Sequence, residues 1–533
     1  MAVATARTVS LHGALGHLID VQADVSPGQA GFTLVGRPDV SLREGADRVR
    51  MAIINSDLRW PGTTKRITVL LSPTDLAKRG AHFDLAMAVG LLAADDSVPR
   101  EALAGTAFIG ELTLDGGLRS VPGVLPMVLA AAERGIRHVF VPEPQSREAA
   151  MVPGMSVLGM RSLAQVVAEL RDEEVPLAPP VAPMSGTRLL TWRGEERLES
   201  VDFADLDGMA DAKYAAEVAA AGGHAILLSG PKGAGKTSLA ERIHSILPDL
   251  SPEEALELTA IHSLAGALEP GDELITAPPY CAPHHDASKT SLIGGGSGQV
   301  RPGEISRAHS GLLFLDEFPL FRNDIIEALR QPLESGDITI ARRDESVTLP
   351  ARGMLVLACN PCPCGNYSVR VGQSRCECRS QQLREYRSKL NGPLADRIDM
   401  TRHVAGLQPH ERGEPSESSL VIKQRVAAAR ALQRERYHGC GWRLNAHVPG
   451  PVLRDRWPLD DAGRRLLDAA LYGGQLSSRG AVRVHRLALT IADLRSLGEQ
   501  GSESSVGADE VETALRLRTG EPLLSATWER RAG

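Results

Sequence analysis

The stretch Gly230-Pro231-Lys232-Gly233-Ala234-Gly235-Lys236-Thr237 decides the fold of this chain, because it matches the phosphate-loop pattern G-x-x-x-x-G-K-[ST]. The apolar run Ala225–Leu228 before it predicts a strand, and Thr237–Leu247 after it predicts a helix that Pro248 ends. Glycines in the loop let backbone N–H groups curl around a phosphate at the amino end of that helix. A chance match is the alternative, and the strand and helix in the required places argue against it.

The residues of this loop have defined roles if they bind a nucleoside triphosphate. Lys236 would reach the β- and γ-phosphates, and the hydroxyl of Thr237 would hold Mg²⁺. The sequence therefore predicts ATP and Mg²⁺ as cofactors. The residues predicted to bind the nucleotide are Gly230, Pro231, Lys232, Gly233, Ala234, Gly235, Lys236, Thr237 and Ser238.

A second motif follows 80 residues after Lys236, where the apolar run Leu312–Leu315 ends in two carboxylates, Asp316 and Glu317. Asp316 suits Mg²⁺ coordination, and Glu317 could polarise the attacking water. An ordinary strand that ends in solvated acids is the alternative. The position of this motif after a phosphate loop favours the catalytic interpretation.

A third apolar run, Met354–Ala358, is followed closely by Asn360. A polar side chain at the tip of a strand beside the other two could orient the water near the γ-phosphate. Taken alone, such an asparagine is more often a turn residue, so this prediction depends on its neighbours.

Composition places the chain among soluble globular proteins with about three domains. Its 533 residues are 43% apolar and 23% charged, which excludes a disordered chain, a collagen-like fibre and a disulfide-rich mini-protein. The formal charge of −7 does not indicate nucleic acid, although it is compatible with local basic surfaces. Cysteine usage and the lack of a secretory apolar region or of ~18 consecutive apolar residues predict a cytoplasmic protein without a membrane span.

The proline-rich segment Pro176–Gly186 predicts the clearest domain boundary, because four prolines within eight residues can continue neither a helix nor a central strand. Before it, β-rich runs alternate with helical patterns, which is typical of an α/β domain. Strands are predicted at 32–35, 66–71, 107–112 and 138–141, and helices at 41–55, 83–94 and 124–134. We expect an α/β domain over 1–175, a linker over 176–190, an α/β core with a parallel sheet over 191–405, a helical lid over 406–500 and a polar tail over 501–533.

The order of five segments resembles the ComM/YifB family of magnesium-chelatase-like AAA+ ATPases. These segments are GPKGAGKT (230–237), GEISRAHSGLLFLDE (303–317), LPARGMLVLACNPCPCG (349–365), GPLADRIDM (392–400) and SSRGAVRVHRLALTIADL (477–494). The resemblance covers nearly the whole chain, and CAPHHDASKTSLIGGG (281–296) is similar to the family's insertion before the second carboxylate motif. It implies a P-loop AAA+ core that hydrolyses ATP.

The resemblance also implies roles for two arginines. Arg397 falls where related ATPases place an arginine finger that acts on the neighbouring subunit's nucleotide, and Arg479 matches the second sensor arginine of the helical lid. Guanidinium groups stabilise the charge that spreads over a transferring γ-phosphate, whereas a surface arginine or an ion pair is the alternative. A finger that acts in trans implies a homo-oligomeric ring, most simply a hexamer. The predicted catalytic residues are Lys236, Asp316, Glu317, Asn360, Arg397 and Arg479.

The first domain resembles the proteolytic domain of Lon protease in RGAHFDLAMAVGLLA (79–93) and FIGELTLDGGLRSVPGVLPMVLAAAERGI (108–136). Lon-type proteolysis needs a serine and a lysine. Here His82 falls where the serine would be, and Val124–Met127 contains no lysine. The domain is therefore predicted to be a structural or ring-building module and not a protease.

Four cysteines lie within 17 residues and could hold Zn²⁺ with four thiolates: Cys362, Cys364, Cys376 and Cys378. The C-x-C spacing is tighter than the two to four residues usual within each pair of a zinc site. Zinc and simple reduced thiols both remain open. The other three cysteines, Cys281, Cys359 and Cys440, are expected to be free thiols.

Three stretches are locally basic: 370–389, 423–443 and a predicted hairpin over 338–349 with Arg342 and Arg343 near its tip. In the ring helicases that this family resembles, such a hairpin points into the central channel, where arginines can grip phosphates without reading sequence. Any one patch is explained by solvation alone. Three patches in a ring ATPase favour single-stranded or branched DNA as a partner.

Two functions follow from the resemblance. The first is an ATP-driven ring, a DNA helicase or translocase, that migrates branched DNA in recombination or natural transformation, as ComM does. The second is an ATPase chaperone that drives metal insertion through a protein partner, as in magnesium chelatase. The domain ahead of the phosphate loop favours the first, because the chelatase ATPase subunit is expected to lack it.

Overall fold

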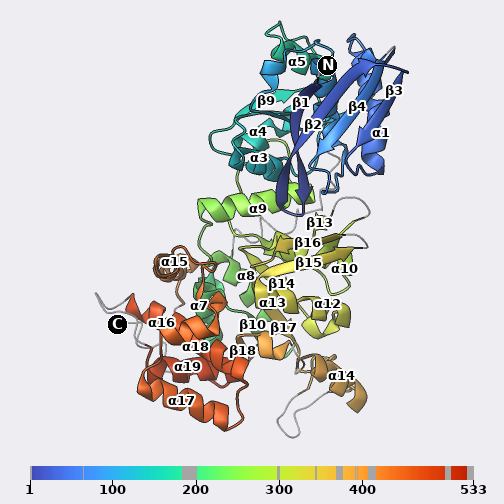
Figure 1. Ribbon diagram of the computed structural model, residues 1–533. Coiled ribbons are helices and arrows are strands. Elements are labelled where there is room, and N and C mark those ends of the chain that lie inside the picture. Colours follow the sequence, from blue (N-terminus) through green and yellow to red (C-terminus); the bar gives the residue numbers. More distant parts are fainter. Residues whose placement is uncertain are drawn as a thin grey trace.

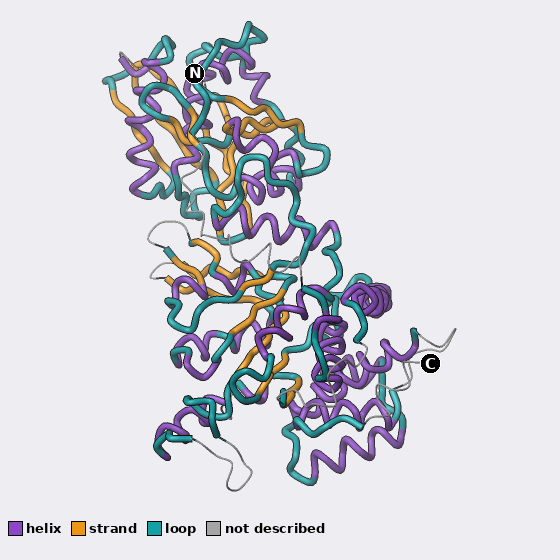
Figure 2. Tube along the Cα trace, turned by 180° about the vertical axis from the view of Figure 1, so that it is seen from behind, coloured by secondary structure: helices purple, strands orange, loops and turns teal. Residues whose placement is uncertain are grey.

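The computed structural model describes residues 3–63, 65–182, 201–296, 300–342, 345–367, 376–390, 392, 394–405, 416–497 and 506–524. Figure 1 shows an N-terminal α/β part, a central part around a parallel sheet, and a group of C-terminal helices beside that sheet. Figure 2, seen from behind, shows the strands gathered in two separate groups. In the part of the chain that the structure describes, no helix has the length and apolar character that crossing a bilayer requires.

A seven-stranded mixed sheet organises the N-terminal part, with the order β3-β4-β2-β1-β5-β8-β9. Its strands are β1 (Val3–His12), β2 (Leu15–Pro27), β3 (Gly31–Val35), β4 (Lys65–Ser72), β5 (Thr106–Phe108), β8 (His138–Pro142) and β9 (Ser156–Met160). A small antiparallel pair joins β6 (Glu111–Leu112) and β7 (Leu118–Arg119). The helices are α1 (Val40–Asn55), α2 (Asp84–Ala94), α3 (Val124–Glu133), α4 (Ser146–Ala150) and α5 (Leu163–Leu170).

Two differences from the predicted elements have local causes. The long hairpin of β1 and β2 was not predicted, because buried positions such as Ala4 and Ala6 carry small side chains that give a weak apolar alternation. The strand predicted over 107–112 is broken, because the Gly110 N–H donates to the His82 carbonyl and the chain leaves the sheet there. Every residue of α2 is buried, as its all-round apolar pattern predicts.

The central part contains a five-stranded sheet with the order β11-β14-β17-β10-β18, in which every pairing is parallel. The strands are β10 (Ile226–Ser229), β11 (Tyr280–Cys281), β14 (Leu312–Leu315), β17 (Met354–Cys359) and β18 (Met400–His403). Parallel strands bring all their carboxyl ends to one edge, where ligands bind in open α/β sheets. The chain segments after β10, β14 and β17 therefore meet at that edge.

Helices and short strand pairs surround this sheet. The helices are α7 (Ala210–Gly222), α8 (Lys236–Ser245), α9 (Pro252–Ala265), α10 (Lys289–Ile293), α11 (Glu304–Arg307), α12 (Asn323–Ala328), α13 (Arg330–Ser335) and α14 (Ser380–Leu390). The strand pairs are β12 (Gly294–Gly295) with β13 (Arg301–Pro302), and β15 (Asp337–Arg342) with β16 (Glu345–Pro350). The second pair is the hairpin that the sequence predicts.

The C-terminal helices are α15 (Ser419–Arg436), α16 (Gly450–Arg456), α17 (Asp461–Tyr472), α18 (Ser478–Ser496) and α19 (Ala508–Thr519). Helix α19 lies in the segment predicted to be a polar tail. It buries Val511, Ala514 and Leu517, spaced three residues apart, in the core that α18 shares with α7. Of the predicted linker, residues 176–182 form no helix or strand, and 183–190 lie outside the described residues.

The N-terminal part contacts the central part at two places. Helix α3 packs on α9, and the turn between β1 and β2 reaches β16. Gly13 in that turn has φ +64, and a Cβ there would lie 2.6 Å from Val347 Cγ1. Glycine is required at this position both by the left-handed backbone and by the close approach.

Candidate functional site

The phosphate loop connects the carboxyl end of β10 to the amino end of α8. Gly233 and Gly235 have φ +78 and +88, which favours glycine, and a Cβ on Gly230 would lie 2.1 Å from the Val404 carbonyl oxygen. Thr237 and Ser238 lie in the first turn of α8. The three glycines thus allow the tight turn that aims backbone N–H groups at a phosphate.

Lys236 lies across the inside of the loop. Its Nζ donates to the carbonyl oxygens of Gly230 at 2.8 Å and Pro231 at 2.9 Å, and to Asn360 Oδ1 at 3.0 Å. The side chain is buried, and desolvation lowers the pKa of Lys236. An ammonium group has three donor protons, and here all three have protein acceptors. The oxygens of an incoming phosphate can replace these acceptors without a large movement of Lys236.

Thr237 and Asp316 meet at the carboxyl edge of the sheet. Thr237 Oγ1 donates to Asp316 Oδ2 at 2.9 Å, and Asp316 Oδ1 accepts from the Glu317 backbone N–H at 2.8 Å. Hydroxyl and carboxylate oxygens are the ligands that Mg²⁺ prefers. Thr237 and Asp316, which derive from segments 79 residues apart, are therefore positioned to hold Mg²⁺ together.

Glu317 follows Asp316 with a left-handed backbone, φ +48, which is uncommon for a residue with a side chain. This conformation ends β14 and leaves the Glu317 side chain 46% exposed at the sheet edge. His285, from the insertion before β14, places Nδ1 3.9 Å from Glu317 Oε2. Its ring contacts that of His284 with centroids 4.1 Å apart and the ring planes tilted by 35°. His285 was not predicted as a site residue, although the His-His pair in CAPHHD could have indicated it.

Asn360 lies directly after β17 and contacts Lys236 through its amide oxygen. Tyr386 on α14 clamps its backbone, because the hydroxyl donates to the Asn360 carbonyl at 3.1 Å and accepts from its N–H at 3.2 Å. Burial raises the pKa of Tyr386, so the phenol stays protonated at neutral pH. Tyr386 is a second residue that the sequence did not reveal, since it is the one buried side chain of an otherwise polar helix.

Arg397 and Arg479 lie together at a different place. Arg397 Nη2 is 2.6 Å and Arg479 Nη2 is 3.7 Å from the same oxygen, Glu334 Oε1. Arg397 precedes β18, whose first residue pairs with the first residue of β10, whereas the phosphate loop follows the last residue of β10. A four-residue strand is about 13 Å long, so neither arginine lies beside Lys236 of its own chain.

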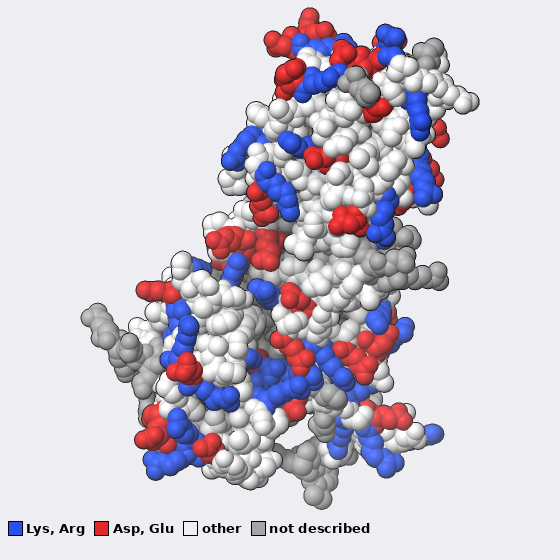
Figure 3. All heavy atoms as spheres, viewed as in Figure 1, with Lys and Arg blue, Asp and Glu red and all other residues white. Residues whose placement is uncertain are grey.

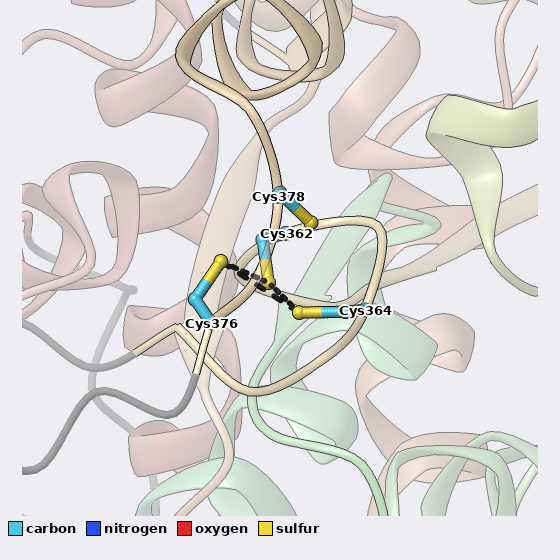
Figure 4. A group of neighbouring side chains, drawn as sticks. All are labelled: Cys362, Cys364, Cys376 and Cys378. Carbon is cyan, nitrogen blue, oxygen red and sulfur yellow. Dashed lines mark hydrogen bonds between the residues drawn. The ribbon is translucent and has the colours of Figure 1, made fainter.

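The four clustered cysteines converge in the loop that follows Asn360 (Figure 4). Cys362 Sγ lies 3.2 Å from Cys364 Sγ and 3.6 Å from Cys376 Sγ, and all four sulfurs lie within 4.8 Å of one another. Zinc with Zn–S bonds of about 2.3 Å separates its tetrahedral sulfurs by about 3.8 Å. A backbone N–H from Asn366 and the Cys362 thiol lower the pKa of Cys364 to about 6, which favours a thiolate. The donor set therefore fits zinc.

Of the two arginines predicted to contact DNA, only Arg342 lies in the described part of the chain. Arg342 is the last residue of β15, and it pairs with Glu345 next to the hairpin turn. Arg343 lies outside the described residues. The hairpin is therefore present with Arg342 at the position next to its tip.

The basic stretch 423–443 is not the free surface that the sequence suggested. Arg425 forms an ion pair with Glu217 at 2.8 Å, Arg436 pairs with Asp493 at 2.5 Å, and Lys423 pairs with Asp249 at 2.8 Å. These carboxylates come from elements far away in sequence, which is why a local charge count missed them. Helix α15 gives little support to DNA binding.

The positions where Lon-type proteolysis would need a serine and a lysine carry no group that could replace them. His82 is buried, its Nε2 lies 2.8 Å from the Val9 carbonyl oxygen, and desolvation lowers the pKa of His82 to about 4. Val124, Leu125 and Met127 at the start of α3 are buried apolar side chains.

Three family models match the chain: "Magnesium chelatase, subunit ChlI" over 202–412, "Subunit ChlI of Mg-chelatase" over 21–145, and "Magnesium chelatase, subunit ChlI C-terminal" over 416–518. An uncharacterized protein of Mycobacterium tuberculosis is 43% identical, covering 97% of this chain and 99% of that protein. The competence protein ComM of Haemophilus influenzae is 37% identical over 92% of both chains. YifB of Escherichia coli is 39% identical over 89% of this chain and 90% of that protein.

A weaker likeness is confined to part of the chain. Lon protease of Rhizobium meliloti is 26% identical over 163 residues, which cover 29% of this chain and 20% of that protein. The proteolytic resemblance is therefore partial.

Proposed function

The chain belongs to the ComM/YifB family of magnesium-chelatase-like AAA+ ATPases, and from this membership we propose that it is an ATP-driven ring motor that migrates branched DNA. The observation that carries the proposal is the relationship to ComM, which extends over 92% of both chains. The name of that relative, a competence protein, favours recombination or natural transformation as the setting. The reduced thiols of the chain agree with work in the cytoplasm.

The residues at the carboxyl edge of the sheet have separate roles in ATP hydrolysis. The loop 230–235 and Lys236 bind the phosphates, and Thr237 with Asp316 holds Mg²⁺. Glu317 accepts the proton of the attacking water, and Asn360 orients that water. The nucleotide with its metal supplies the transferable γ-phosphoryl group.

In a ring, an adjacent copy of the chain would supply two arginines to the ATP site. Arg397 precedes β18 at the sheet edge opposite the phosphate loop, and Arg479 shares Glu334 with it, so in our proposal both act on the nucleotide of an adjacent copy. Glu334 holds both guanidinium groups until that contact forms. We propose a hexamer, with the parts bounded as predicted: 1–175, 176–190, 191–405, 406–500 and 501–533.

The N-terminal part is proposed to be a structural module rather than a protease. His82 is buried against the Val9 carbonyl group, and the α3 residues that precede Met127 offer no amine. Its contact with β16 at Gly13 supports a role in holding the hairpin.

The DNA contact is proposed to lie at the tip of the β15–β16 hairpin. Replacing Arg342 and Arg343 by alanine together is expected to weaken binding of a four-way junction and of single-stranded DNA while basal ATP turnover survives. Each lost phosphate contact should lower the slope of log affinity against log salt by about 0.7 to 0.9. Sequence preference should not change, because phosphate contacts carry no base information.

The control for this salt titration is Arg464→Ala with Arg465→Ala, an adjacent pair of exposed arginines on α17. This pair should leave affinity and slope unchanged. Equal affinity and slope for the wild type and the hairpin variant would assign Arg342 and Arg343 to an ordinary solvated surface.

The four cysteines are proposed to bind one Zn²⁺ that braces the segment between Asn360 and α14. Metal analysis of freshly purified, reduced protein should find about one zinc per chain, and Cys364→Ser should lose it. Because α14 carries Tyr386, zinc removal should loosen the clamp on Asn360 and slow turnover more than it weakens nucleotide binding. Cys440→Ser, outside the cluster, is the control; no zinc in the wild type contradicts the proposal.

A metal-insertion chaperone is the second candidate function. All three matching models are described as parts of a magnesium chelatase subunit, including the model over residues 21–145. The domain ahead of the phosphate loop therefore does not separate the two functions, contrary to the argument from sequence. A wild-type protein that binds no DNA at low salt would make this candidate the leading one.

A further inference from the structure

A deep cavity lies between the central sheet and the C-terminal helices, at the sheet edge opposite the phosphate loop. One wall contains Ala225, Gly311 and Met354, which stand at the amino ends of β10, β14 and β17. The other wall includes Arg430 from α15 and Arg486 from α18. It encloses about 180 Å³, and Figure 3 shows basic side chains gathered in the hollow between the two parts.

The lining of the cavity carries five arginines and four carboxylates. Arg352, Arg430 and Arg486 line it, and among the described residues no carboxylate oxygen lies within 4.0 Å of their guanidinium groups. The acids of the lining already have basic partners. Asp399 pairs with Arg483 at 2.5 Å, Glu334 with Arg397 at 2.6 Å, Glu257 with His309 at 3.3 Å, and Glu254 with Arg443 at 3.5 Å.

Two of these arginines are half-buried and are held by backbone oxygens. Arg430 donates from Nε and Nη2 to the Ala220 carbonyl at 2.9 and 2.7 Å, and Arg486 donates from Nε to the Val448 carbonyl at 2.8 Å. Desolvation lowers the pKa of Arg430 to about 10. Glu254 acts on Arg430 and Asp399 on Arg486 at longer range. The five arginines of the lining nevertheless exceed its four carboxylates, so the cavity attracts an anion.

We propose that this cavity binds a small phosphoryl anion of diphosphate size through Arg352, Arg430 and Arg486. Guanidinium groups match phosphate oxygens with paired hydrogen bonds, and the enclosed volume excludes a nucleic-acid duplex. Trp442, another lining residue, has a buried indole N–H without an acceptor. Because Glu334 in the wall also holds Arg397 and Arg479, the ligand occupies a place from which it can influence the ring contacts.

The test is a calorimetric titration of inorganic pyrophosphate into full-length Lys236→Ala protein, whose phosphate loop is disabled. We expect one binding site per chain. Arg486→Gln in the same background should weaken the affinity by about 10-fold or more, as expected for loss of a charge-assisted hydrogen bond. Because Arg486 also supports Val448, Arg352→Gln serves as a second variant, since its guanidinium makes no hydrogen bond with the described residues.

Arg434→Gln is the matched control, because Arg434 is exposed on α15 one turn beyond Arg430. It should leave the affinity unchanged. No binding at millimolar pyrophosphate, or unchanged affinity in both Arg352→Gln and Arg486→Gln, would overturn the proposal.

Two sources could supply the phosphoryl group: a free anion from solution, or the nucleotide bound by an adjacent copy of the chain. A second titration uses wild-type protein saturated with a non-hydrolysable ATP analogue. Retention of the pyrophosphate site shows that it is separate from the nucleotide sites and assigns it to the free anion. Loss of the site means that pyrophosphate had occupied a nucleotide site, which overturns the proposal of a separate site in this cavity.

Discussion

Replacing Lys236 by alanine is expected to eliminate ATP binding at physiological concentrations and, with it, all ATP turnover. The ammonium group of Lys236 is buried inside the loop, where it donates hydrogen bonds to Gly230, Pro231 and Asn360. Charge-assisted hydrogen bonds contribute about 1.5–3 kcal/mol each, so the loss of contacts to two phosphates weakens affinity by at least ~100-fold. Equilibrium binding of a fluorescent ATP analogue measures this directly.

Lys289→Ala is the control, because Lys289 is an exposed lysine on α10 and lies outside the phosphate loop. It should bind ATP with an affinity close to that of the wild type. Near-normal ATP affinity in Lys236→Ala would mean that the cation on the phosphates comes from another residue.

Replacing Glu317 by glutamine is expected to leave ATP binding intact and to stop hydrolysis, which traps an ATP-bound ring. Glutamine keeps the size and the left-handed backbone position of the residue but cannot accept a proton from water. Loss of a general base lowers turnover by about 10²-fold or more. Steady-state turnover and single-turnover hydrolysis of bound ATP separate this effect from a binding defect.

Glu327→Gln, an exposed acid on α12, is the control and should hydrolyse ATP normally. If Glu317→Gln retained near-normal turnover, the base would have to be sought elsewhere. His285, whose Nδ1 lies 3.9 Å from Glu317 Oε2, is then the nearest candidate in the described part of the chain.

The sequence predicted which residues meet at the carboxyl edge of the central sheet, because the motifs impose their own geometry. A glycine loop must join a strand to a helix, and parallel strands bring Asp316 and Asn360 to the same edge as Lys236. Tyr386 and His285 were missed because their roles depend on contacts with residues that are distant in the sequence.

The dependence on contacts between distant residues also explains why the charged surface was predicted wrongly. Arg425 looked solvated within its own segment, but Glu217, 208 positions earlier, neutralises it on the neighbouring helix α7. Conversely, Arg352, Arg430 and Arg486 are far apart in the sequence, and only folding brings them to one cavity. A charge count along the chain cannot separate these two outcomes, because both are decided by tertiary packing.

In the proposed motor, ATP hydrolysis at the Lys236 site is coupled to branched DNA. The most direct test measures ATP turnover by the wild-type protein with no addition, with single-stranded DNA and with a four-way junction. We expect basal turnover that Lys236→Ala abolishes, and a several-fold rise with DNA that is largest for the junction. Turnover that neither DNA changes, in a protein that hydrolyses ATP normally, would contradict the DNA motor and leave an ATPase that acts on a protein partner.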